Sequence, residues 1–195
     1  MSDRLPDFAA LIGSRICHDL ISPLGAIGNG VELLSMSGAG GGPELALIAD
    51  SVANANARIR FFRIAYGAAA GEVAEAEIRS ILTGMANGGR VAIDWRIAGP
   101  VSRARAKLAF LALQCLETAL PFGGKVTVTA AGAVWEARAD GARLAVDAAL
   151  WSNLTAPAPD PAITPAQLQF ALLPVEAGPG GIDLRQTDGS VTIRF

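Results

Sequence analysis

The stretch "SRICHDLISPLGAIGNGVELL", residues 14–34, contains His18, the only histidine of the 195-residue chain. Apolar residues around it recur every three or four positions, at Phe8, Ile12, Ile16, Leu20, Leu24, Ile27, Val31 and Leu34. This spacing forms one stripe along a helix, so it predicts a helix from Pro6 to about Leu34. Pro6 suits the first turn, where its missing N–H costs nothing.

A second helix is predicted after the glycine-rich turn "SMSGAGGGP", residues 35–43. From Pro43 the apolar spacing alternates three and four, as in a heptad seam, through Leu45, Ile48, Val52, Ala55, Ile59, Phe62 and Tyr66. Two helices joined by a short turn form an antiparallel hairpin. Because a lone hairpin leaves apolar surface exposed, we expect a homodimer in which two hairpins make a four-helix bundle. We assign dimerisation to residues 1–68.

The remainder, residues 69–195, has a different pattern. Helices are predicted over 72–86 and 103–120, and strands over 90–97, 124–131, 133–139 and 142–148. Residues 182–195 predict a hairpin with Asp188 and Gly189 in its turn. The proline-rich residues 152–167 predict a loop, with Thr164 capping a helix at Pro165. The whole chain is therefore predicted to be α+β, a helical hairpin followed by an α/β sandwich with helices on one face of a mixed sheet.

Composition limits the class of protein. A net charge of -2 lacks the basic excess that nucleic-acid binding requires, so we expect no nucleic-acid partner. Two cysteines form neither a disulfide framework nor a zinc site. The first ten residues lack the apolar core of a signal peptide, and no apolar run approaches the roughly 20 residues that span a bilayer. We expect a soluble cytoplasmic protein with no membrane association.

His18 lies opposite the apolar stripe when the helix is drawn at about 100° per residue. Its neighbours on that face are small or polar, namely Ser14, Ser22, Gly25 and Asn29. An exposed imidazole is largely neutral near pH 7 and therefore nucleophilic, and small neighbours let another protein reach it. Most single exposed histidines, however, are only surface residues.

Two further residues modify this interpretation. Asp19 follows the histidine directly and could orient a ring N–H or assist proton transfer. Pro23 cannot donate a hydrogen bond to the carbonyl of Asp19, so we expect the helix to kink or loosen just after His18.

Residues 18–27, "HDLISPLGAI", resemble the H-box of two-component histidine kinases, of the form H-[ED]-L-x-x-P-L. The hairpin is similar to their dimerisation and phosphotransfer domain, and residues 69–195 are similar in layout to their ATP-binding domain. More closely, residues 14–34 resemble the ChpT-type histidine phosphotransferases of alphaproteobacteria. The resemblance implies that His18 is phosphorylated and that Asp19, Pro23 and Asn29 belong to the surrounding motif.

The predicted ATP-binding part departs from the kinase pattern. Leu111 and Cys115 stand where asparagines would hold Mg²⁺, and neither side chain offers the oxygen ligands that this ion needs. Asp147 is present where a D-x-G-x-G loop is expected, but Ala149 and Trp151 replace its glycines. The glycines of residues 175–184 are weak evidence for a nucleotide loop, since a tight turn also uses them. We expect no cofactor and no metal site in this chain, with Mg²⁺ supplied by the partner.

The leading hypothesis is a phosphorelay intermediate. His18 would take a phosphoryl group from the phosphoaspartate of one receiver domain and pass it to the aspartate of another. The resemblance implies a hybrid kinase as the donor and response regulators of the cell cycle as acceptors. We expect partners to dock on Ser14, Arg15, Ser22, Gly25 and Asn29. One alternative is an ATP-dependent histidine kinase with an unorthodox nucleotide site, and another is a non-enzymatic dimeric adaptor for receiver domains.

Two minor features have structural interpretations. Arg58, Arg60 and Arg63 form a basic strip on the second helix, which is either a solvated face or a surface for acidic receivers. The three tryptophans, Trp95, Trp135 and Trp151, are expected in the core.

Overall fold

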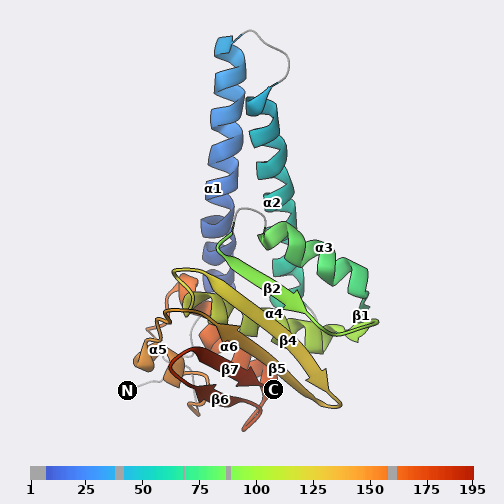
Figure 1. The fold of residues 1–195 in the computed structure, drawn as a ribbon, viewed down its shortest axis with the longest axis vertical. Helices are drawn as coiled ribbons and strands as arrows, with labels where there is room; N and C mark the ends of the chain where they lie inside the picture. Colours follow the sequence, from blue (N-terminus) through green and yellow to red (C-terminus); the bar gives the residue numbers. More distant parts are fainter. Residues whose placement is uncertain (1–7, 38–41, 68, 87–88, 158–161) are drawn as a thin grey trace.

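The computed structural model describes residues 8–37, 42–67, 69–86, 89–157 and 162–195. Within the first helix, the side chains of residues 8–18, 21, 35 and 37 lie outside the described part. Helix α1 (Phe8–Ser37) and helix α2 (Pro43–Ala65) stand side by side as a long hairpin, whose upper part projects from the rest of the chain and whose lower part packs against it (Figure 1). Both predicted helices are confirmed; of the predicted glycine turn, residues 35–37 belong to α1, and residues 38–41 lie outside the described residues.

The contact between α1 and α2 uses small and buried side chains. Pro23 and Gly30 are buried on α1, and Ser51 and Ala55 are buried on α2. A Cβ atom added at Gly30 would overlap the side chain of Ile48, so glycine allows the two helices to approach closely.

The predicted apolar stripe is therefore only partly the seam of this hairpin. Leu24 and Val31 are 57% and 52% exposed, whereas Leu20, Ile27 and Leu34 are half-buried. The helix is rotated so that Asp19, Pro23 and Gly30 lie closest to α2, and the middle of the apolar stripe lies to one side of that seam. Leu24 and Val31 of this stripe therefore stay exposed in the single chain.

The last turns of α2 belong to the core of the second part of the chain. Phe61, Phe62, Ile64 and Ala65 are all buried there, and the ring of Phe61 stacks on that of Phe110 with 4.5 Å between centroids. α2 is thus a single helix that packs on α1 and, through its last turns, on the second part as well.

The second part is built on a mixed sheet of five strands in the order β2-β4-β5-β7-β6. Its strands are β2 (Val91–Trp95), β4 (Gly124–Ala131), β5 (Val134–Asp140), β6 (Asp183–Gln186) and β7 (Ser190–Arg194). β2 is parallel to β4, and the other pairs are antiparallel. A separate short pair joins β1 (Glu72–Val73) to β3 (Val101–Ser102).

Helices cover one face of this sheet (Figure 1). They are α3 (Glu75–Ala86), α4 (Arg103–Thr118) and α6 (Leu168–Ala177), the last preceded by a 3-10 turn η1 (Pro165–Gln167). α4 lies at the centre, with every residue from Ala106 to Leu116 buried. The other sheet face is polar and includes Lys125, Thr127 and Arg138. The predicted α+β class, with helices on one face of a mixed sheet, is confirmed.

One predicted strand is wrong. Residues 142–148 form no strand, and a short helix, α5 (Ala148–Ser152), begins at their end. The Asp147 carboxylate caps it by accepting hydrogen bonds from the N–H groups of Ala149 and Leu150 at 2.9 and 3.1 Å. The N–H of Ala145 donates to the carbonyl of Ala119 at the end of α4, not to a strand. Local capping overrides the alternating pattern here.

The predicted turn, helix cap and buried tryptophans of the second part are confirmed. Asp188 and Gly189 lie in the turn between β6 and β7, and Thr164 precedes η1 as its N-cap. Trp95, Trp135 and Trp151 are all buried. The helix predicted from residue 72 begins at Glu75, because residues 72 and 73 pair with β3. In the described part of the chain, every helix is too short or too polar to cross a membrane.

Candidate functional site

His18 lies within α1, ten residues after the helix begins. Its side chain lies outside the described residues, as do those of Ser14 and Arg15. The surroundings of residue 18 are therefore defined by the residues that follow it on α1 and by the segment of α2 that faces them.

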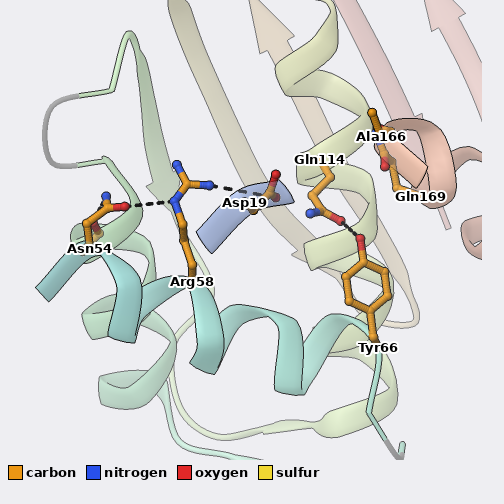
Figure 2. A network of polar contacts seen from close by, with 8 residues as sticks. Asp19, Asn54, Arg58, Tyr66, Gln114, Ala166 and Gln169 are labelled. Carbon is orange, nitrogen blue, oxygen red and sulfur yellow. Dashed lines mark hydrogen bonds and ion pairs between the residues drawn. The ribbon is translucent and has the colours of Figure 1, made fainter. Parts of the chain in front are cut away.

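Asp19 points toward α2. One carboxylate oxygen, Oδ2, lies 4.0 Å from Nη1 of Arg58, and only 8% of the Asp19 side chain is exposed. Figure 2 shows this ion pair between the side chains of Asp19 on α1 and Arg58 on α2. The residue next to His18 is thus attached to the second helix of the hairpin.

Arg58 is itself held on its other side. Its Nε–H donates to Oδ1 of Asn54 at 2.9 Å, one turn earlier on α2 (Figure 2). The side-chain amide of Asn54 then donates to the carbonyl of Gly84 in α3 at 3.4 Å. We call this chain of contacts, Asp19–Arg58–Asn54–Gly84, the polar relay. It joins the helix that carries His18 to the second part of the chain.

A polar groove lies between the two helices at the same level. α1 contributes Asp19, Ser22, Pro23 and Ala26, and α2 contributes Asp50, Ser51, Asn54 and Arg58, around a volume of about 400 Å³. Carboxylate, hydroxyl, amide and guanidinium groups all line it. Ser22, one of the predicted docking residues, is exposed and lies at the edge of this groove.

The described docking residues form an open strip. Ser22, Gly25 and Asn29 are all exposed, and a Cβ atom added at Gly25 would meet nothing within 4 Å. They follow residue 18 by four, seven and eleven positions, which is the spacing of one helix face. A partner can therefore lie against this strip without displacing side chains of this chain.

Pro23 has a packing role. α1 continues through it without interruption from Phe8 to Ser37, and the proline is buried at the wall of the groove. Since proline has no N–H, it cannot make the usual helical bond to the carbonyl of Asp19. The kink remains a prediction.

The arginines of the predicted basic strip on α2 make contacts within the chain. Arg58 belongs to the polar relay, Arg60 donates to Oγ of Ser80 at 3.1 Å, and Arg63 lies 3.6 Å from Glu77. These arginines attach α2 to α1 and α3, because α3 packs along the same side of α2.

The residues that the sequence comparison with kinases aligned to an ATP site lie in the core or cap a helix. Leu111 and Cys115 are fully buried in α4, and burial raises the pKa of the Cys115 thiol well above its usual value. Trp151 is buried against Phe170, with ring centroids 5.3 Å apart. Asp147 uses its carboxylate to cap α5. Among the described residues, no group of histidine, cysteine, aspartate or glutamate side chains could hold a metal ion.

Sequence reasoning missed Asn54 and its contact with Arg58. Their signal is a pair of polar residues four positions apart within an apolar heptad pattern. Such a pair fits a solvated helix face equally well, so only the position of α3 reveals its role.

Comparisons with known proteins agree with this architecture. Residues 75–187 match the family described as the histidine phosphotransferase C-terminal domain. Protein phosphotransferase ChpT of Brucella abortus (strain 2308) is 37% identical over 132 residues, which are 65% of this chain and 62% of that protein. The chain thus matches less than two thirds of the length of this curated relative. A solved bacterial phosphotransferase superposes with a TM-score of 0.78 at 30% identity, covering 96% of this chain and 95% of that one.

The family match covers more than half of the chain, so the chain belongs to the histidine phosphotransferase family. The resemblance to ChpT-type proteins, first indicated by residues 14–34, is confirmed. The structural match extends over nearly the full length and therefore includes the hairpin.

Proposed function

We propose that this chain is a histidine phosphotransferase of a two-component phosphorelay and that His18 carries the phosphoryl group. The observation that supports this most directly is the position of the sole histidine on α1, in an H-D-L-x-x-P-L motif, beside an open strip and a polar groove. Family membership and the ChpT relative support the same activity.

The proposed transfer needs a nucleophile, His18, and a group that stabilises the positive charge formed on its ring. A lone pair on a ring nitrogen of neutral His18 forms the N–P bond, while the P–O bond to the receiver's aspartate breaks and its electrons remain on that carboxylate. The imidazole is left cationic until its second ring nitrogen loses a proton. Asp19, as the adjacent carboxylate, would stabilise that cation and orient the ring. The reverse reaction delivers the phosphoryl group to a second receiver.

The proposed partners are the receiver domain of a hybrid histidine kinase and the receiver domains of response regulators. They would dock on Ser14 and Arg15 and on the open strip of Ser22, Gly25 and Asn29. Phosphoryl transfer depends chiefly on positioning and on neutralising charge, and the receiver would bring the Mg²⁺ that does the latter. Such partners place the protein in the cytoplasm.

We propose a homodimer in which two hairpins form a four-helix bundle. Leu24 and Val31 are exposed at heptad spacing on α1, and Leu45, Val52 and Ile59 are exposed at the same spacing on α2. In two antiparallel helices, stripes offset in the same sense from the shared seam lie on one side of the hairpin. A second copy would bury both stripes together. By helical spacing, residue 18 falls on the opposite side.

Residues 1–68 would thus perform dimerisation and phosphotransfer. Residues 69–195 would form a degenerate relative of the kinase ATP-binding domain, which supports the hairpin without using ATP. The burial of Leu111 and Cys115 supports this assignment.

The test is transfer of radiolabelled phosphate from a phosphorylated receiver to the purified chain. We expect acid-labile label on the native protein and none on His18→Ala, whose melting temperature and dimer mass should remain native. Label retained on His18→Ala would contradict the proposal. Binding of the receiver without any label on the native chain would favour the adaptor alternative.

A further inference from the structure

The polar relay gives the segment around His18 a fixed support. It starts at Asp19, next to the proposed phosphorylated residue, and ends at a backbone carbonyl of α3. Arg58 is the central member: its side chain faces Asp19 on α1 and binds Asn54 on α2. The Arg58 side chain is 30% exposed, and it forms part of the wall of the groove.

The far end of the relay rests on a close helix contact. Gly84 lies so near Ala57 of α2 that an added Cβ atom would come within 2.6 Å of the Ala57 Cβ. The carbonyl that accepts from Asn54 is therefore held by main-chain packing between α2 and α3. α3 in turn packs on β2 and on the core.

We infer that Arg58 is a positioning residue for phosphotransfer, which holds the Asp19 carboxylate at the groove wall beside residue 18. The inference rests on the proposed function of His18. The guanidinium is a planar fork that can bind Asn54 through Nε and face Asp19 through Nη1 at the same time. Asn54 fixes the plane of that fork, and the Gly84 carbonyl fixes Asn54.

This arrangement assigns a role to the second part of the chain. α3 sets the position of Asn54, and Asn54 sets the position of Arg58, so the sheet domain determines where the acid beside His18 lies. A domain without the residues of a nucleotide site thus contributes to the geometry of transfer.

The experiment uses the full-length protein and two phosphodonors, a phosphorylated receiver and phosphoramidate. Arg58→Gln should lower the maximal rate of His18 phosphorylation about tenfold with both donors, because a displaced acid affects the chemistry itself. The KM for the receiver should change less than about twofold, since the open strip is untouched. Arg58→Lys keeps the charge but not the fork, so its rate should fall between those of the native protein and Arg58→Gln.

Arg63→Gln is the matched control. It also removes an arginine that links α2 to α3, at Glu77, but it lies outside the polar relay. Its transfer rates should stay native. Asn54→Ala should slow transfer less than Arg58→Gln does, and the double variant should equal Arg58→Gln alone, because Asn54 acts through Arg58.

The possible failures are distinguishable. If the native chain takes no label, the proposed function fails. If the native chain is labelled but Arg58→Gln takes phosphate from phosphoramidate at the native rate, the inference alone is wrong. Equal losses in Arg58→Gln and Arg63→Gln would also overturn it, because they would indicate a general loosening of α2 from α3. If Arg58→Gln does not fold, Asn54→Ala provides the test instead, and native transfer rates in Asn54→Ala would overturn the inference.

Discussion

Gly30 of α1 and Ile48 of α2 are in such close contact that the hairpin has no room for a side chain at residue 30. An added Cβ atom would overlap the Ile48 side chain and come within 3.3 Å of the Glu44 carbonyl oxygen. Two residues earlier on the same helix, Gly28 has nothing within 4 Å of such an atom. This contrast allows the packing of the hairpin to be tested with a single methyl group.

Gly30→Ala should destabilise the protein by about 1–3 kcal/mol, because the extra methyl forces Ile48 or the helix to move. Gly28→Ala should stabilise it by about 0.5–1 kcal/mol, because alanine favours a helix interior over glycine. Urea unfolding at one fixed protein concentration measures both. Equal changes in the two variants would show that the helices are not packed closely at Gly30.

Ile59 and Phe62 allow the proposed dimer contact to be tested separately from the core. Ile59 is 49% exposed, whereas Phe62 is buried in the core. Ile59→Glu should therefore yield a folded monomer, with half the native mass by light scattering and native circular dichroism. Phe62→Glu should unfold the chain, because an unpaired charge in that core cannot be solvated. A native dimer in Ile59→Glu would place the interface elsewhere.

Gly25 tests docking independently of chemistry. Gly25→Leu should block phosphate exchange with receivers in both directions and leave the uptake from phosphoramidate native, because a bulky side chain on the strip excludes a protein but not a small donor. Gly25→Ala serves as control and should be nearly silent in both assays, since its methyl group meets nothing within 4 Å. Native transfer from a receiver to Gly25→Leu would show that partners dock on another face.

ATP should not bind. Leu111, Cys115 and Trp151, which the resemblance aligns with residues of a kinase ATP site, are buried apolar side chains, and the Asp147 carboxylate already accepts two backbone hydrogen bonds. We expect millimolar ATP with Mg²⁺ to leave the melting temperature unchanged and the chain unlabelled. A ligand at 100 times its dissociation constant stabilises by about 2.7 kcal/mol, which a thermal melt detects. Such a shift would revive the kinase alternative.

The sequence predicts the hairpin and most of the sheet because their patterns are long and regular. The heptad spacing of α2 and the alternation of residues 124–131 each admit one interpretation. The exact rotation of α1 was not predictable, because it depends on where small residues allow the closest approach. Gly30 and Pro23 supply that approach, and neither stands out in a pattern of apolar residues.

The candidate site was predictable on α1 and hidden on α2. The motif around His18 is local in sequence, so the proposed docking residues follow from it directly. The polar relay joins residues 19, 54, 58 and 84, and its meaning depends on how three helices pack. The wrong strand at residues 142–148 has a local cause, since the alternating pattern ends at Asp147, which favours a helix start.

Because α2 runs from the hairpin into the sheet domain, different parts of this one helix should unfold locally at different free energies. Amide protons near Phe61 and Ile64 can exchange with solvent only when the core itself unfolds, whereas those near Leu45 can exchange through local fraying of the upper hairpin. Protection should therefore rise along this single helix from its first turn to its last. Cutting the chain after Ala65 would place four buried apolar side chains in water, so the two helices do not constitute an independent folding unit.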